Sequence, residues 1–182
     1  LTLLLWLMFF ANIATLVFIN SWLATILVSA GIAKTVAILI AALTNAGGIF
    51  GGIIVSELCD RWEARRFSIL GAGFLLGSLS IAAIGATGSD VAMALIAALL
   101  AGVFTFGTQN TANAVAATIY PTTMRSTGAG WAIGVGNSAQ IFSPLLAGFL
   151  LSLHWSATMV LVVMALPGLA AAVVAWRLGR SA

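Results

Sequence analysis

The sequence is poor in charge, and this shortage excludes an ordinary water-soluble domain. Asp, Glu, Lys and Arg make up 6% of its 182 residues, and 62% of the residues are hydrophobic. Soluble domains carry about 25% charged residues, so most of this surface must face lipid rather than water. The seven basic residues are too dispersed to follow a phosphate backbone, and we expect no nucleic-acid partner.

Side chains for chemistry are equally scarce. The single cysteine, Cys59, excludes an internal disulfide and has no partner for a metal site. No Asp, Glu, Lys, Arg or His falls well inside any apolar segment, and His154 is expected at the outer end of the last one. A membrane-embedded enzyme needs acid–base pairs, nucleophiles or metal ligands at that depth. We therefore expect no enzyme, no metal and no cofactor.

Long apolar runs are what the sequence does contain. A helix that crosses the bilayer needs about 20 apolar residues, because hydrocarbon offers no partner for free backbone groups. The predicted fold is an all-α integral membrane domain over residues 1–182, with six transmembrane helices at about 2–28, 36–56, 67–87, 91–118, 129–151 and 155–176. The chain begins in an apolar run without an initiator Met or a basic region, so we expect it to start inside a longer protein.

The basic residues predict how these helices are oriented. Six helices place both termini on one side, and that side holds Arg61, Arg65, Arg66, Arg125, Arg177 and Arg180. Of the seven Lys and Arg residues, only Lys34 lies on the other side. This bias predicts a multi-pass membrane protein with both termini in the cytoplasm.

Neutral amides stand out within the apolar segments. They are Asn12, Asn20, Asn45, Gln109, Asn110, Asn113, Asn137 and Gln140. At 100° per residue, Gln109 and Asn113 lie about 40° apart on their helix, and Asn137 and Gln140 about 60° apart. Such groups near the bilayer midplane suit a polar ligand held between helices. Structural hydrogen bonds between helices are the alternative. The third and sixth segments have no amide and are expected to pack outside a path lined by the other four.

Glycines are spaced for close helix packing. Pairs four residues apart let helix backbones approach each other in a bilayer. These pairs are Gly47/Gly51, Gly48/Gly52, Gly73/Gly77 and Gly130/Gly134.

The stretch "ELCDRWEARR", residues 57–66, holds six of the eleven charged residues and is predicted to form a polar loop. It resembles the cytoplasmic loop motif of the major facilitator superfamily, with Asp60, Arg61, Arg65 and Arg66 at matching positions. The family's usual glycines are replaced by Ser56 and Glu63.

Three further stretches narrow the resemblance. "LLLWLMFFANIATLVFINSWLATIL", "TNAGGIFGG" and "IYPTTMRSTGAGWAIGVGNSAQIFSP" are similar to the aromatic acid:proton symporter branch of that superfamily, from about Thr2 to Trp176. The resemblance implies the C-terminal six-helix half of a twelve-helix transporter, which would import a small organic anion such as a hydroxybenzoate by alternating access. Its membrane would be a bacterial cytoplasmic (inner) membrane. Its partners would be the substrate, protons, the lipid bilayer and an N-terminal half absent here, with the proton gradient as the energy source.

Two positions depart from this branch. Asn137 stands where the family commonly has arginine, and Ala24 where it often has proline. An amide keeps the hydrogen bonding of arginine but loses its charge. A major facilitator transporter of a different organic acid, or of an efflux substrate, is therefore the alternative. A scaffold or a channel is disfavoured by the amide-bearing helices and by the lack of a charged ring or carbonyl filter.

Charges of both signs in "ELCDRWEARR" predict a conformational latch, since topology alone requires only the basic ones. Asp60 can accept hydrogen bonds from arginines or from a helix N-terminus. Arg125 is expected on the same side and is the candidate partner. Asp60, Arg61, Arg65, Arg66 and Arg125 are thus the predicted gating residues.

Overall fold

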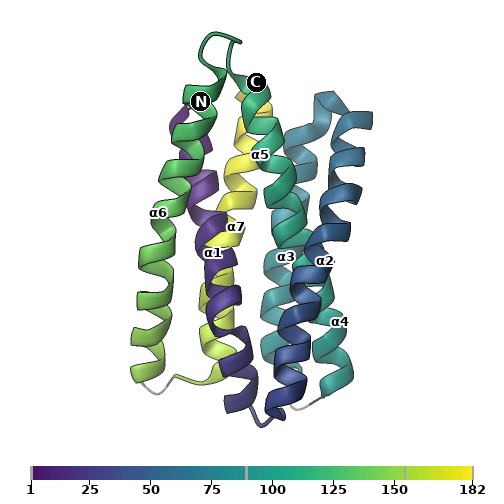
Figure 1. Ribbon diagram of the computed structural model, residues 1–182, viewed down its shortest axis with the longest axis vertical. Helices are drawn as coiled ribbons and strands as arrows, with labels where there is room; N and C mark the ends of the chain where they lie inside the picture. The colour runs from purple at the N-terminus through teal and green to yellow at the C-terminus, as the bar shows by residue number, and fades with distance from the viewer. Residues whose placement is uncertain (1, 89, 154, 182) are drawn as a thin grey trace.

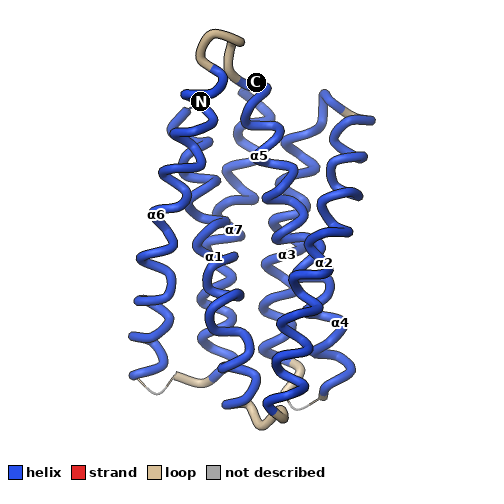
Figure 2. Tube along the Cα trace, in the orientation of Figure 1, coloured by secondary structure: helices blue, strands red, loops and turns tan. Residues whose placement is uncertain are grey.

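The computed structural model describes residues 2–88, 90–153 and 155–181, and helices make up nearly all of this part of the chain (Figure 2). His154 lies outside the described residues. The elements in order are α1 (Thr2–Ser29), α2 (Lys34–Arg61), η1 (Glu63–Arg65), α3 (Arg66–Ala86), α4 (Val91–Ala101), η2 (Gly102–Phe106), α5 (Gly107–Ile119), α6 (Arg125–Ser152) and α7 (Ala157–Ser181).

The prediction of six membrane-spanning helices is confirmed for the described ranges. Five of these spans are built on α1, α2, α3, α6 and α7. The remaining span joins α4 and α5 through η2, a turn of π-helix. Both termini lie at one end of the bundle (Figure 1), which we call the terminal end. At the other end, the opposite end, Gly31 and Gly88 have φ of 94° and 57° and allow tight turns between helices.

The prediction that residues 57–66 form a loop is wrong. α2 continues through Arg61, five residues beyond the predicted end, and η1 adds a turn of 3-10 helix. Arg61 Nε lies 2.8 Å from Glu57 Oε1, and this pair four residues apart supports the last helical turn. Cys59 is buried in the same turn, which anchors it to the bundle.

Helices from the first half of the chain pack mainly on helices from the second half. α1 packs against α6 and α7, α2 against η2 and α5, and α3 against α7 and α4. The first three spans are therefore held together largely through the last three. α6 packs mostly on α1 and leaves much of its surface uncovered.

Two apolar clusters form the core, one toward each end of the bundle. The cluster toward the terminal end includes Leu5, Phe9 and Phe74, and the cluster toward the opposite end includes Phe18 and Ile40. Buried polar side chains lie at or near the boundary between the clusters: Asn12, Thr15, Thr44, Ser78, Thr105, Thr108, Gln109, Thr111 and Ser143. The middle of the bundle is thus a polar layer between two apolar ones.

Backbone contact between α2 and the π-helical segment holds this middle layer together. A Cβ added at Gly47 would lie 2.7 Å from the carbonyl oxygen of Leu99. A Cβ at Gly51 would overlap the carbonyl oxygen of Val103, and one at Gly102 would overlap that of Thr44. Glycine on both helices permits this approach, as predicted for Gly47 and Gly51.

The Gly130/Gly134 pair does not follow the predicted packing role. A Cβ at either position would meet nothing within 4 Å in the described chain. α6 buries Ala132, Gly136 and Ala139 against α1, and that face is roughly opposite to Gly130 and Gly134 on the helix. Spacing alone could not distinguish the two faces.

Gly51→Ala is expected to lower the free energy of unfolding of the six-helix chain by about 1–3 kcal/mol, because the added methyl group must displace the backbone at Val103. Gly130→Ala is the matched control, since its added methyl enters open space and alanine favours helix by up to about 1 kcal/mol. The measurement is unfolding in detergent micelles. Equal stability of the two variants would contradict the proposed packing.

Candidate functional site

A line of three amides crosses the bundle in the polar layer. Asn12 on α1 donates from Nδ2 to Gln109 Oε1 on α5, at 2.7 Å. Gln109 in turn donates from Nε2 to Asn113 Oδ1, one turn further along α5, at 3.0 Å. Asn12 and Gln109 are 1% and 5% exposed, whereas Asn113 is half-buried, so the line runs from the core toward the surface.

This line leaves hydrogen-bonding capacity unused. Asn12 Oδ1 is buried without a hydrogen-bond partner among the described residues, as are the hydroxyls of Thr105 and Thr108. Most hydroxyls in the layer bond a carbonyl oxygen one turn back, such as Thr44 to Ile40 and Ser78 to Phe74. The unpaired atoms in the polar layer thus lie on α1, η2 and α5, and the two threonine hydroxyls face Gly77 and Gly73 of α3.

Two further amide pairs lie on exposed surface. Asn45 on α2 donates from Nδ2 to Asn20 Oδ1 on α1 at 3.3 Å and also to the carbonyl oxygen of Ala41. Gln140 donates from Nε2 to Asn137 Oδ1 on α6 at 3.0 Å. All four side chains are exposed, so these pairs can exchange their mutual hydrogen bonds for bonds to water or a ligand.

Seven of the eight predicted amides are therefore joined in three groups rather than one cluster. Helical spacing correctly predicted that Gln109 shares a face with Asn113, and Asn137 with Gln140. The partners across helices, Asn12 with Gln109 and Asn20 with Asn45, emerge only from the packing. Asn110 is exposed next to Gly52, where an added Cβ would lie 3.7 Å from its Nδ2.

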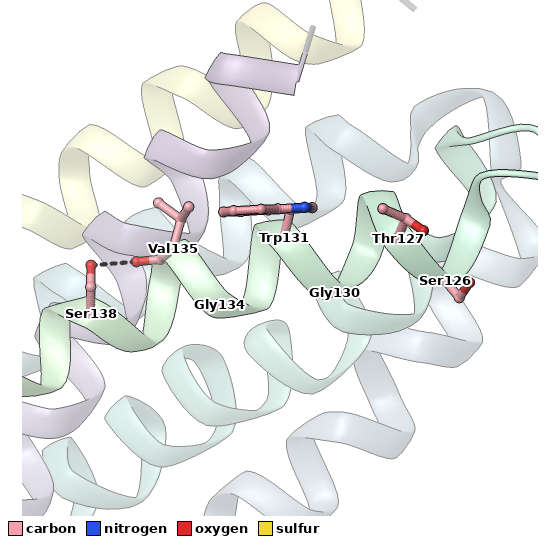
Figure 3. Close-up of a pocket in the computed structure, with 7 residues that line it drawn as sticks. All are labelled: Ser126, Thr127, Gly130, Trp131, Gly134, Val135 and Ser138. Atoms are coloured by element: carbon pink, nitrogen blue, oxygen red, sulfur yellow. Dashed lines mark hydrogen bonds between the residues drawn. The ribbon is translucent and has the colours of Figure 1, made fainter.

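A shallow groove follows part of the uncovered face of α6 (Figure 3). Its cavity of about 680 Å³ is lined by Ser126, Thr127, Gly130, Trp131, Gly134, Val135 and Ser138. Gly130 and Gly134 contribute no side chains to this groove. Trp131 stacks on Trp6 of α1 with ring centroids 6.0 Å apart. Asn137 follows Gly130 by seven residues and points within about 20° of the same direction.

The charged residues at the terminal end do not pair with one another as predicted. Arg61 pairs with Glu57, while Arg66 donates from Nη1 to Thr118 Oγ1 on α5 at 2.9 Å. In the described part of the chain, Asp60 forms no hydrogen bond or ion pair, and the predicted Asp60–Arg125 contact is not formed. Arg65 and Arg125 are exposed.

Asp60 and Arg66 instead face a common cavity between α2, η1 and α5. This cavity of about 200 Å³ is also lined by Glu63 and by Ser56, Thr111 and Thr118. The three hydroxyl residues were missed in the sequence. Thr111 and Thr118 are seven residues apart, which places them on one face of α5 and is the signal that could have identified them. Ser56 and Thr111 oxygens lie 3.1 Å apart across the two helices.

A double-mutant cycle on Asn12 and Gln109 tests whether their contact joins α1 to α5. Asn12→Leu and Gln109→Leu are each expected to lower the free energy of unfolding by about 1–3 kcal/mol, because each leaves a buried amide unpaired. The double variant should lose less than the sum, with a coupling of about 0.5–1.5 kcal/mol. Unfolding in detergent micelles measures all four forms, and strictly additive losses would show that the amides are uncoupled.

Comparisons with known proteins agree with this architecture. The sequence profile of the Major Facilitator Superfamily matches residues 5–182. A protein named as a gallate transporter from Pseudomonas putida is 33% identical over 171 residues, which is 94% of this chain and 38% of that protein. A 4-hydroxybenzoate transporter from Pseudomonas aeruginosa is 32% identical over 91% of this chain and 37% of its own length.

A benzoate transport protein from Acinetobacter baylyi is 31% identical over 84% of this chain and 32% of its own length. These three relatives are named for the transport of aromatic acids, and the chain spans well under half the length of each. With six membrane-length helices in its described part and a profile match over nearly its whole length, the chain is a multi-pass integral membrane protein that belongs to the Major Facilitator Superfamily.

Proposed function

We propose that the chain is the C-terminal half of a transporter that takes up a small aromatic carboxylate together with protons, by alternating access. The other half would be a second bundle of six helices, and the membrane a bacterial inner membrane with the termini in the cytoplasm. The observation that carries the proposal is the hydrogen-bonded line Asn12–Gln109–Asn113, which runs from the core toward the surface at mid-height.

Neutral amides at this depth suit a ligand with a polar head and an apolar ring. Amide N–H groups can donate to a carboxylate, and amide oxygens can accept from ring hydroxyls. The exposed pairs Asn20–Asn45 and Asn137–Gln140 would present further donors where a second half could close over the substrate. The relatives named for gallate, 4-hydroxybenzoate and benzoate support this substrate class.

The proton would be carried by the other half. The sequence of this chain has no titratable side chain well inside its spans, and a proton relay in a membrane requires one. The amide-bearing half would then bind the substrate, while an acidic residue of the partner half would couple the movement to the pH gradient.

A second candidate keeps the family but changes the cargo. Asn137 places an amide rather than a cation at mid-height on α6, and an amide binds neutral polar groups as readily as carboxylates. This favours another organic acid or an efflux substrate. Inhibition of labelled 4-hydroxybenzoate uptake distinguishes the candidates. A transporter of aromatic carboxylates should be inhibited by benzoate more strongly than by its neutral amide, benzamide, or by a non-aromatic carboxylate such as acetate.

Uptake by the complete transporter in proteoliposomes tests the proposal directly. With the outside more acidic than the inside, labelled 4-hydroxybenzoate should accumulate above its outside concentration, and a protonophore should abolish the accumulation. Protein-free liposomes measure the diffusion of the protonated acid. Flux that never saturates would indicate a channel, and flux equal to the liposome control would contradict transport of this substrate.

Asp60→Asn is expected to reduce uptake to background while membrane insertion stays normal, because the predicted latch needs the carboxylate near Arg66. Glu57→Gln is the matched control: it removes one exposed acid from the same helical turn and loses only the pair with Arg61. Uptake is measured per inserted transporter. Near wild-type uptake by Asp60→Asn would refute the latch role.

A further inference from the structure

A cavity at the opposite end of the bundle has the chemical composition of a site for an aromatic anion. Its volume is about 320 Å³, and it lies between the end of α1 and the start of α2. Ala24, Val28 and Ile38 provide apolar walls, Thr25 provides a hydroxyl, and Lys34 provides an ammonium group. A site that binds an aromatic carboxylate needs apolar walls for the ring, and a hydrogen-bond donor and a positive charge for the carboxylate.

Lys34 is available to a ligand. It is exposed at the first position of α2, and the described residues give it no hydrogen bond or ion pair. Asp90 is the other charged residue described at this end, and its Oδ1 accepts hydrogen bonds from the backbone N–H groups of Ala92 and Met93. The six arginines are all near the terminal end. Lys34 therefore supplies the positive charge at the mouth of this cavity.

The cavity is aligned with the exposed amide pair deeper in the bundle. Asn45 follows Lys34 by eleven residues, which puts the two side chains within about 20° on α2 and about 16 Å apart along its axis. On α1, Ala24 lies one turn from Asn20 and points within about 40° of it. Asn20 and Asn45 bond each other across the same helix pair. One surface strip thus connects the mouth to mid-height.

We propose that this cavity, the Lys34 mouth, is an outer capture site for an aromatic carboxylate, which binds there before it moves along the α1–α2 strip to Asn20 and Asn45. The carboxylate pairs with the Lys34 ammonium and accepts a hydrogen bond from Thr25, while the ring lies against Ala24, Val28 and Ile38. The inference rests on the proposed uptake function and on the opposite end facing outward.

Binding at the Lys34 mouth is weak. It raises the substrate concentration close to the transporter and does not change the rate of the transport cycle itself. An exposed ion pair is screened by salt and changes affinity by no more than about fivefold. Its loss should therefore raise KM and leave the maximal rate unchanged. The effect should disappear at high ionic strength, where screening removes the attraction.

The test measures initial uptake of labelled 4-hydroxybenzoate by the complete transporter, at low and at high salt. Lys34→Gln should raise KM about three- to fivefold at low salt and make KM nearly independent of salt. Lys34→Arg keeps the charge and should resemble the wild type. Arg180→Gln removes the same charge at the terminal end, where it should not change KM.

A second variant tests the apolar part of the site independently of the charge. Ala24→Phe fills the cavity beside Lys34 and should raise KM at both salt concentrations, with rates expressed per inserted transporter. If the wild type takes up no hydroxybenzoate, the proposed function fails and the inference fails with it. If the wild type transports but Lys34→Gln retains its KM and salt dependence, the capture site alone is overturned.

Discussion

The structure depends on one constraint: inside a bilayer no solvent is available to satisfy a polar group. The chain meets it for the backbone by being helical over nearly all its described length, and for most hydroxyls by a bond to a carbonyl oxygen one turn back. One such bond cannot fully satisfy an amide, because each amide carries two donors and an acceptor, and Asn45 bonds both the carbonyl oxygen of Ala41 and Asn20. Most amides therefore also pair with one another, across α1 and α5 in the core and across α1 and α2 at the surface.

This constraint explains why the polar layer lies at mid-height between two apolar clusters. The apolar clusters hold the six helices together toward both ends, while glycines at Gly47, Gly51 and Gly102 let α2 and the π-helical segment touch by their backbones in between. Close backbone packing leaves little room for side chains there, so small and polar residues can occupy the layer without opening cavities. A polar layer and a stable bundle are thereby compatible in one chain of six spans.

Apolar length and residue spacing in the sequence were sufficient to predict the six spans, the shared faces of the α5 and α6 amide pairs, and the close approach at Gly47 and Gly51. Apolar length and spacing could not predict which helix faces pack against each other, or the contacts that form there. Asn12 and Gln109 are 97 positions apart, and only packing brings them together. Gly130 and Gly134 have the same spacing as Gly47 and Gly51 but lie on the uncovered side of α6. The extension of α2 through Arg61 was missed because the dense charge of residues 57–66 was interpreted as a loop. The spacing of Glu57 and Arg61, four residues apart, was the signal for a further helical turn.

We propose that the exposed amides line an aqueous path that holds the aromatic acid. Cysteine accessibility in the complete transporter, with Cys59 replaced by Ala, measures this directly. Asn45→Cys and Asn137→Cys should react with a water-soluble maleimide, and saturating 4-hydroxybenzoate should slow both reactions. Leu145→Cys, on the apolar exposed part of α6, should react poorly with or without the acid. Equal labelling of all three positions, unaffected by 4-hydroxybenzoate, would contradict such a path.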